Sequence, residues 1–224
     1  MIDAWPAVLP PPSVAPLEDL PTDSLVVARG RRTHLRTLVP ADLDHFSSWC
    51  EDPFLERMVG SEFFHNFKHV YDKGPEFYEA CLTDPSQVAF MVEDNRPPRG
   101  REVTPLGIVR LFNIHLREGY AFLETIITDQ RALRRGYGIE AGRLISYYGV
   151  DVLGLRRIEA KVYEYNVLSV NALRRNGFIQ EGVLRQAGFQ GDRYWDLLIF
   201  GILKDEIEAQ RRKDIVCYPV EPDR

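Results

Sequence analysis

The residues best suited to chemistry lie in the segment 133–141, where two arginines precede two glycines. Arg134 and Arg135 supply positive charge, and Gly136 and Gly138 let a ligand approach the backbone closely. A helix that starts at these glycines would add unpaired backbone N–H groups, which bind phosphate together with basic side chains. The segment therefore predicts a pyrophosphate site.

The helix that must position this loop is indicated by hydrophobic periodicity. Apolar side chains recur downstream with the spacing i, i+3, i+4, i+7 and i+11, which places them on one helical face. They are Ala141, Leu144, Ile145, Tyr148 and Val152. Gly154 is a natural C-cap. We expect a helix over residues 136–153, preceded by a strand over residues 120–128.

A second interpretation of the glycines is a dinucleotide site. Residues 136–141 also satisfy the G-x-G-x-x-A pattern of that site. That fold requires a strand that runs almost directly into the first glycine, and an acidic residue at a strand end about 20 positions later. Here residues 129–135 intervene, and Glu159 falls in the middle of a predicted strand. An NAD-dependent oxidoreductase is therefore the less favoured alternative.

Composition places the chain among soluble globular proteins. It has 224 residues, 45% of them hydrophobic, and a net charge of −5. That length suits one domain with extensions, and the acidic balance disfavours a nucleic-acid partner. No signal peptide and no apolar run long enough for a bilayer is visible. We therefore expect a cytoplasmic protein with no membrane partner.

The cysteine and histidine patterns give no indication of a metal. Cys50, Cys81 and Cys217 are odd in number and widely spaced, which argues against a disulfide framework and against a zinc site. His65 and His69 have the i, i+4 spacing of a metal pair, but no third ligand stands near them in the sequence. We expect no metal.

Three regions are predicted along the chain. Residues 1–22 contain six prolines and are expected to form an N-terminal extension, either flexible or packed on the body. Residues 23–205 are expected to form the folded domain, and residues 206–224 a charged C-terminal tail, as a helix or an irregular segment on the surface. The aromatic stretch 54–81 suits either core packing or the wall of a substrate pocket.

The domain is predicted to be rich in strands. Residues 157–163 alternate apolar and charged side chains, with Ile158, Ala160 and Val162 on one face. A helix is expected to start at Pro40, with acidic residues in its first turn. The remaining expected elements are strands at 25–27, 33–37, 87–93 and 105–112, a short helix at 169–176, and a hairpin of 178–189 with 193–203.

The order of these strands, helices and motifs over residues 24–205 resembles that of the GCN5-related N-acetyltransferase (GNAT) family. The resemblance rests on the strand 120–128, the Arg-Arg-Gly-Tyr-Gly loop, the N-x-x-S of Asn166 and Ser169, and the Arg-Asn-Gly-Phe at 175–178. Within the family, the chain most resembles the branch that contains the ribosomal-protein N-terminal acetyltransferases and related small-amine acetyltransferases. The resemblance implies an α+β fold: a mixed, mostly antiparallel central sheet with helices on both sides. Two of its neighbouring strands splay apart, and acetyl-CoA lies between them.

The resemblance also implies roles for individual residues. Those expected to hold the pyrophosphate are Arg134, Arg135, Gly136, Tyr137 and Gly138. Those expected along the pantetheine arm or the cofactor are Ile126, Ile127, Thr128, Asn166, Ser169, Asn171 and Arg175. Ile126 and Thr128 would pair their backbone with the arm, and Ile126 or Ile127 would donate an N–H to the oxyanion. Tyr194 and Asp196 would line or support the acceptor site.

The catalytic residues are less clear, because the chain departs from the family at three positions. Leu133 replaces a Gln or Arg, Leu173 replaces a tyrosine that protonates the thiolate in some members, and Phe122 replaces a glutamate. Glu124 lies on the same strand face as Phe122 and is the candidate general base. Ser169 is the candidate proton donor; otherwise it serves as a hydrogen-bonding residue at the helix start.

Together these features predict an acyltransferase. It would transfer an acetyl group from acetyl-CoA, as co-substrate, directly to a primary amine of a small molecule or a protein N-terminus in a ternary complex. The missing tyrosine at Leu173 leaves a non-catalytic CoA-binding protein as an alternative. The resemblance makes a homodimer plausible.

Overall fold

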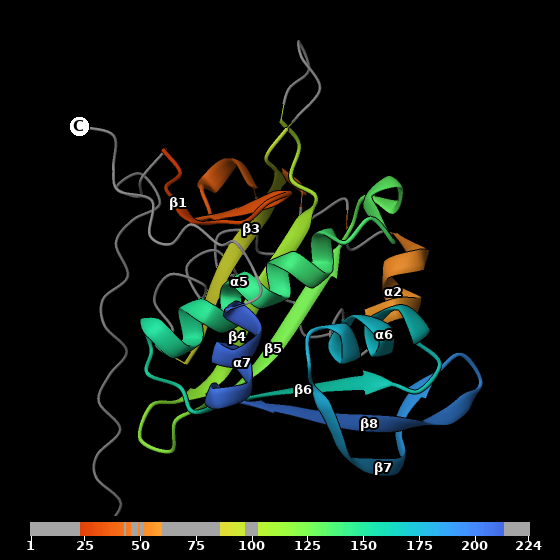
Figure 1. Ribbon diagram of the computed structural model, residues 1–224. Helices are drawn as coiled ribbons and strands as arrows, with labels where there is room; N and C mark the ends of the chain where they lie inside the picture. The colour runs from red at the N-terminus through yellow and green to blue at the C-terminus, as the bar shows by residue number, and fades with distance from the viewer. Residues whose placement is uncertain are drawn as a thin grey trace, which may run out of the picture.

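A single eight-stranded sheet organises the protein, as shown in Figure 1. The computed structural model describes residues 23–42, 44–45, 49, 52–59, 86–96 and 103–212. In chain order the strands are β1 (Val26–Arg29), β2 (Thr33–Arg36), β3 (Val88–Asp94), β4 (Gly107–His115), β5 (Tyr120–Ile127), β6 (Arg157–Tyr163), β7 (Ile179–Gln190) and β8 (Arg193–Leu203). They lie side by side in the order β1-β2-β3-β4-β5-β6-β8-β7.

Only one neighbouring pair in this sheet, β5 with β6, is parallel. The other six pairs are antiparallel. The expected mixed, mostly antiparallel sheet is therefore confirmed. Because β5 runs parallel to β6, its carboxyl end leads into a crossover through a helix, as parallel strands require.

That crossover helix, α5 (Tyr137–Asp151), packs against β2, β4 and β5. Among the described residues, the other helices with given bounds are α2 (Pro53–Val59), α6 (Val167–Arg175) and α7 (Lys204–Arg211), with short 3₁₀ turns η2 (Pro40–Asp42) and η3 (Gln130–Ala132). Both α6 and α7 contact α5, so these three helices gather on one face of the sheet (Figure 1).

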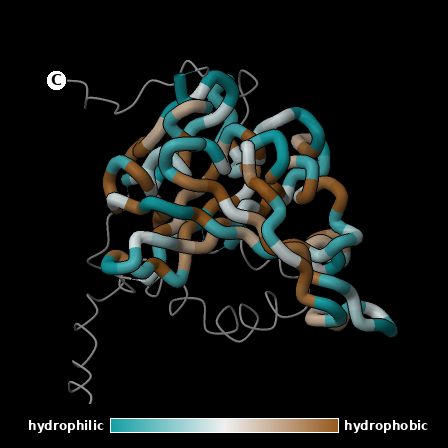
Figure 2. The backbone as a smooth tube through the Cα atoms, turned by 60° about the horizontal axis from the view of Figure 1, so that its bottom comes forward, coloured by the Kyte–Doolittle hydropathy of each residue, from teal (hydrophilic) through white to brown (hydrophobic). Residues whose placement is uncertain are grey.

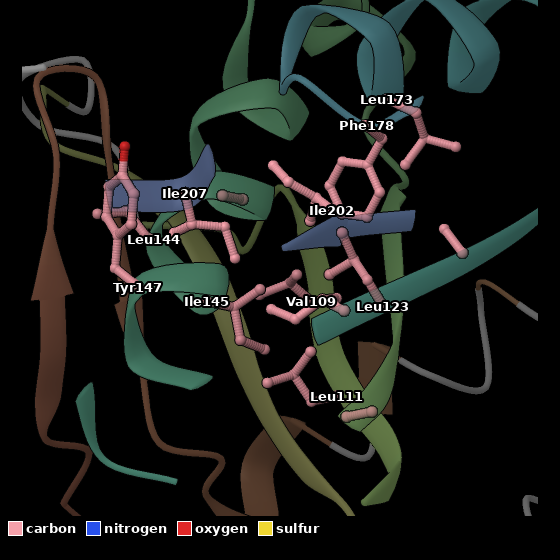
Figure 3. Packing of buried hydrophobic residues seen from close by; sticks show 14 of the residues in the cluster. Val109, Leu111, Leu123, Leu144, Ile145, Tyr147, Leu173, Phe178, Ile202 and Ile207 are labelled. Carbon is pink, nitrogen blue, oxygen red and sulfur yellow. The ribbon is translucent and has the colours of Figure 1, made fainter. Parts of the chain in front are cut away.

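The core lies between this helical layer and the sheet (Figure 3). From α5, Ala141, Leu144 and Ile145 are fully buried, as the periodicity predicts. Val152 is 56% exposed, so its predicted inward position is wrong. Val152 is the C-cap of α5, and the last buried residue of the helix is Val150, so burial ends before the helical periodicity does.

Two predicted boundaries also differ from the structure. Ile207, in the segment predicted as tail, is 2% exposed and belongs to the core, so the boundary after residue 205 falls inside α7. The helix expected from Pro40 opens with a 3₁₀ turn over Pro40–Asp42, and the described residues that follow, 44, 45 and 49, are helical. Asp42 in the turn is buried, and its carboxylate accepts hydrogen bonds from Arg36 at 2.7 Å.

Hydrophobic stretches along the backbone are short and alternate with hydrophilic ones (Figure 2). Accordingly, no helix in the described part of the chain is long and apolar enough to cross a bilayer.

Candidate active site

The loop before α5 has the backbone conformation of an anion site. Arg134 and Gly136 both have positive φ, 62° and 91°, and Gly136 is the N-cap of α5 without any side-chain cap. The first amides of a helix have no intrahelical acceptor. Because no side chain caps them here, the amides that follow Gly136 can serve an anion, as the sequence predicts.

The side chains at this loop divide into two groups. Arg134 and Arg135 are exposed, and neither forms an ion pair with any carboxylate of the described residues. Tyr137 points elsewhere: its hydroxyl donates to Asp94 Oδ2 at 2.7 Å, which raises the pKa of the phenol. The side chain of Tyr137 therefore braces α5 against β3, and only its backbone N–H remains as a candidate for phosphate.

The two glycines of the motif serve different purposes. A Cβ at Gly136 would meet nothing within 4 Å, so lack of space does not explain the glycine. Its left-handed backbone conformation does, because glycine adopts it without strain. A Cβ at Gly138 would lie 3.1 Å from Ile127 Cγ1 of β5. Gly138 therefore lets the helix pack closely on the strand, in addition to any ligand contact.

Strands β5 and β6 separate after a short paired stretch. They pair only from Tyr120–Arg157 to Phe122–Glu159. The carbonyl of Gly119 accepts from the amide of Arg157 on β6 at 3.1 Å. Backbone groups alternate in direction along a strand, so the odd-numbered residues of β5 face β6. Beyond the last pair, those of Thr125 and Ile127 face the opening between the strands.

This alternation corrects two of the predicted pantetheine contacts. The amide of Thr128 donates to the carbonyl of Leu106 at 2.8 Å, and Ile126 pairs with Ile108 of β4. Their backbone groups are therefore turned toward β4 and away from the opening. Thr125, which the sequence interpretation missed, and Ile127, which it included, are the β5 residues whose backbone faces the opening. The alternation of backbone direction, counted from the parallel β5–β6 pair, identifies them, and their contact with the pantetheine arm stays a prediction.

The start of α6 is fastened to α2 by Asn166. Asn166 is buried; its Oδ1 accepts from the amide of Ser169 at 3.1 Å, and its Nδ2 donates to the carbonyl of Met58 at 2.7 Å. Asn166 therefore caps the helix and ties it to α2. Its proposed cofactor contact stays a prediction, as do those of Ser169, which is half-buried, and of Asn171 and Arg175, which are exposed.

Glu124 lies two residues beyond the last β5–β6 pair, at the start of the opening. It stands directly opposite Arg110 of β4, and the Nε of Arg110 donates to its carboxylate. Burial raises the pKa of Glu124, although the charge and hydrogen bond of Arg110 act in the opposite direction. Arg110 escaped the sequence interpretation, although the register of the β4–β5 hairpin would have found it.

The β7–β8 hairpin carries the residues expected at the acceptor site. Tyr194 is 64% exposed and its ring packs against Phe189 at 5.1 Å between centroids. Asp196 Oδ1 accepts from the amide of Gln186 at 2.8 Å. A hollow lined in part by Arg185, Gln186 and Asp196 opens beside it. Asp196 therefore shapes a surface depression, whereas Tyr194 stands on the outer face of the hairpin.

The end of β6 and the β7–β8 hairpin share an aromatic group that the sequence interpretation missed. The ring of Tyr165 meets Trp195 edge-on at 4.7 Å and stacks on Tyr163 at 5.2 Å. Arg193 lies over the Trp195 ring at 3.3 Å. Burial, followed by the neighbouring Tyr163, raises the pKa of Tyr165 to about 12.

Three further expectations concern what the site does not contain. No group of His, Cys, Asp and Glu within the described residues is arranged to hold a metal, while His65 and His69 lie outside those residues, as does most of the stretch 54–81. Leu173 is buried in the core, so no acid replaces the missing tyrosine there. The dinucleotide alternative does not fit this sheet, because that fold needs a mostly parallel sheet and six of the seven strand pairs here are antiparallel.

Comparison with known proteins decides the family. Residues 32–179 match the acetyltransferase (GNAT) domain family. The chain belongs to the GNAT family. This GNAT protein is 29% identical over 179 residues, 71% of each chain, to an alpha/beta-tubulin-N-acetyltransferase 9 of Mus musculus. It is also 38% identical over 71 residues, 32% of this chain and 40% of the other, to the uncharacterized N-acetyltransferase YoaA of Bacillus subtilis.

Solved structures agree on the fold of this GNAT protein. A spermidine N-acetyltransferase from Vibrio cholerae, in complex with CoA and spermine, superposes with a TM-score of 0.64 at 22% identity, covering 79% of this chain and 98% of the other. A probable acetyltransferase superposes with a TM-score of 0.65 at 17% identity, covering 81% and 98%. The GNAT protein is thus an acetyl-CoA-dependent acyltransferase of the N-acetyltransferase type.

Proposed function

We propose that this protein transfers the acetyl group of acetyl-CoA directly to a primary amine of a small molecule or a protein N-terminus, in a ternary complex. Similar proteins are named for spermidine and for tubulin, which both present amines. The single observation that carries the proposal is the opening between β5 and β6, which leads to the uncapped start of α5.

The residues around this opening fit CoA. The amides after Gly136 and the guanidinium groups of Arg134 and Arg135 suit its pyrophosphate. The backbone groups of Thr125 and Ile127 face the opening and suit an extended pantetheine arm, which pairs like an added strand. Acetyl-CoA, when bound, supplies the thioester whose carbonyl carbon the amine attacks.

Glu124 is the proposed general base. The attacking amine must be neutral, because an ammonium has no lone pair, so its proton passes to the carboxylate directly or through water. The hydrogen bond from Arg110 fixes the direction of the carboxylate. The amide of Ile127 is the proposed donor to the thioester oxygen, and the Ser169 hydroxyl the proposed donor to the sulfur.

Acceptors are proposed to enter beside the β7–β8 hairpin. Asp196 and Glu164 bring carboxylates to this side, where Glu164 Oε1 accepts from the amide of Asp196 at 3.4 Å. The rings of Tyr165 and Trp195, which contact each other at 4.7 Å, follow or precede these carboxylates in the chain. Carboxylates and aromatic faces both attract cationic amines, which is the form in which most amines arrive.

Thermal unfolding with acetyl-CoA, CoA, NADH or no ligand tests the proposal. A ligand present at 100 times its Kd stabilises the folded protein by about 2.7 kcal/mol. We expect both CoA species to raise Tm and NADH to leave it unchanged. Arg134→Glu/Arg135→Glu should abolish the shift, whereas Arg117→Glu/Arg212→Glu, on exposed arginines outside the loop, should retain it. No shift with either CoA species in the unmodified protein would refute the proposed cofactor site.

Turnover is measured next, as thiol release with spermine and with short peptides that have a free N-terminal amine. Direct transfer predicts initial-rate lines that intersect when both substrates are varied. Parallel lines would instead indicate a covalent acetyl-enzyme and contradict the ternary complex.

A further inference from the structure

The turn between β1 and β2 brings a second pair of arginines to the start of α5. Arg31 and Arg32 are exposed at this turn. The Nη1 of Arg32 donates to the carbonyl of Arg135 at 3.2 Å. Segments about 100 residues apart in the chain therefore meet here, and they place Arg31 and Arg32 beside the loop that carries Arg134 and Arg135.

Glu140, in the first turn of α5, holds this β1–β2 turn in place. Its carboxylate accepts from the backbone amides of Arg31 at 2.9 Å and of Arg32 and Thr33 at 2.8 Å each. Gly30 permits the close approach, because a Cβ there would lie 2.7 Å from Glu140 Cδ. Three hydrogen bonds to one charged acceptor fix the turn strongly.

Asn95, which follows β3, braces the turn from its other side. Its Nδ2 donates to the carbonyls of Gly30 at 2.6 Å and Thr33 at 3.2 Å, and its Oδ1 accepts from Arg29 Nη1 at 3.1 Å. The backbone of the turn is therefore held before any ligand arrives. A pre-organised turn loses less conformational entropy when its side chains bind an anion.

The carboxylates of Glu140, Asp94 and Asp129, near these arginines, already accept hydrogen bonds from other groups. Three amides compensate Glu140, the hydroxyl of Tyr137 donates to Asp94, and Arg131 pairs with Asp129 at 3.0 Å. Among the ion pairs of the described residues, none includes Arg31, Arg32, Arg134 or Arg135. The cluster is thus strongly positive in an otherwise acidic protein of net charge −5.

We propose that Arg31 and Arg32 bind the 3′-phosphate of CoA, while the start of α5 binds its pyrophosphate. The inference rests on the proposed function. CoA carries this phosphomonoester on the same ribose that bears the pyrophosphate, so the two anions must bind near each other. The monoester has a charge of about −1.5 to −2 at neutral pH, and planar guanidinium groups bind it through two hydrogen bonds. The β1–β2 turn therefore selects CoA over 3′-dephospho-CoA.

The test compares the Kd of CoA with that of 3′-dephospho-CoA by calorimetry. Unmodified protein should bind CoA roughly 10- to 100-fold more tightly, the range that a charged hydrogen bond confers. In Arg31→Ala/Arg32→Ala this ratio should fall to about 1, with the Kd of 3′-dephospho-CoA unchanged. Arg117→Ala/Arg212→Ala, which has the same net charge, should keep the full ratio; Tm without ligand verifies that both variants fold.

The outcomes separate the two proposals. If the unmodified protein binds both ligands equally, or if Arg31→Ala/Arg32→Ala keeps the full ratio, the 3′-phosphate is not read by this turn while the proposed function stands. An equal loss of affinity for both ligands in that variant would also overturn the assignment. If the unmodified protein binds neither ligand, the proposed function itself fails, and this inference with it.

Discussion

At the scale of single residues, the catalytic proposal depends on the pKa and the orientation of the Glu124 carboxylate. Burial raises its pKa, and Arg110 on the neighbouring strand opposes that shift while orienting the group. A base needs a pKa close to the working pH to be both ionised and able to take a proton. Glu124 is moved in that direction from the ordinary glutamate value of 4.5.

Glu124→Gln should lower kcat by about 10²- to 10⁴-fold, because the amide cannot accept the proton. Since only the ionised carboxylate acts as base, kcat/KM of the unmodified enzyme should rise with pH through the raised pKa of Glu124, and the variant should lack that limb. Glu159→Gln, on the neighbouring strand, serves as the control and should keep the limb. A pH–rate profile that is identical in Glu124→Gln would exclude Glu124 as the base.

The side chains of His34 and Arg36 form ion pairs with Glu93, and these pairs should make the stability of the protein depend on pH in the acidic range. Burial alone would raise the pKa of Glu93, but hydrogen bonds and charge from His34 and Arg36 lower it overall. Arg36 Nε donates to Glu93 at 2.6 Å. A carboxylate whose pKa is lower in the folded protein stabilises it above the unfolded pKa of about 4.5, and this contribution is lost as pH falls through the folded value.

We therefore expect the free energy of unfolding to decrease as the pH falls below about 4.5, and Glu93→Gln to reduce the slope of that decrease. At neutral pH the variant should lose about 1–3 kcal/mol, the usual effect of removing one charged partner of a buried hydrogen bond. Urea unfolding at a series of pH values measures both quantities. Equal slopes in the two proteins would show that Glu93 has no lowered pKa.

At the scale of elements, the separation of β5 from β6 turns a strand edge into a binding surface. Pairing ends at Phe122 and Glu159, after which backbone groups of β5 lack a strand partner on that side. The uncapped start of α5 follows at the end of the same strand. The strand therefore presents an extended edge that suits the pantetheine arm of CoA, and the helix after it presents an anion site that suits the pyrophosphate.

Hydrogen exchange tests which residues form that edge. The amides of Thr125 and Ile127 should exchange quickly in the free protein and slow markedly when CoA is bound, because they face the opening. The amides of Glu124 and Ile126 face β4 and should be protected in both states, so they are the internal control. If CoA slowed the exchange of only the Ile126 and Thr128 amides, these two residues would pair with the pantetheine arm, as the family resemblance implies, and our assignment of Thr125 and Ile127 would be wrong.

At the scale of the whole molecule, α7 closes the helical layer over the sheet. Ile207 is 2% exposed and packs in the main core. Arg211 adds an ion pair with Asp151 of α5 and lies 5.1 Å from the centre of the Tyr147 ring. The segment after β8 is therefore part of the domain, and it fastens the C-terminal half of α5, the helix whose other end binds phosphate in our proposal.

Ile207→Ala should lower the free energy of unfolding by about 2–5 kcal/mol, the usual effect of truncating a buried large aliphatic side chain. Val152→Ala, at a position that the helical periodicity places inside but the structure leaves exposed, should change it by less than about 0.5 kcal/mol. Chemical denaturation of the three proteins gives both values. A loss in Val152→Ala comparable to that in Ile207→Ala would contradict the position of the helix end.

Local sequence patterns were enough to predict most strands, the central helix and the motif that indicates the family. The spans of β6 and β8 match the predicted ones, and α5 begins within one residue of its predicted start. These features are local: alternation, helical periodicity and a glycine-rich loop act within a few residues of each other. The uncapped N-terminus beside Arg134 and Arg135 could therefore be predicted without any tertiary information.

Which backbone and side-chain groups face which partner could not be predicted from those local patterns, because it depends on how the strands and helices pack together. Thr125 replaced Thr128 at the opening because strand parity depends on the register with β6. Asn166 became a helix cap tied to Met58, and Arg31 and Arg32 joined a loop about 100 residues away through Glu140. Such contacts join residues far apart in the chain, and they are set by packing of the sheet and helices rather than by any local pattern.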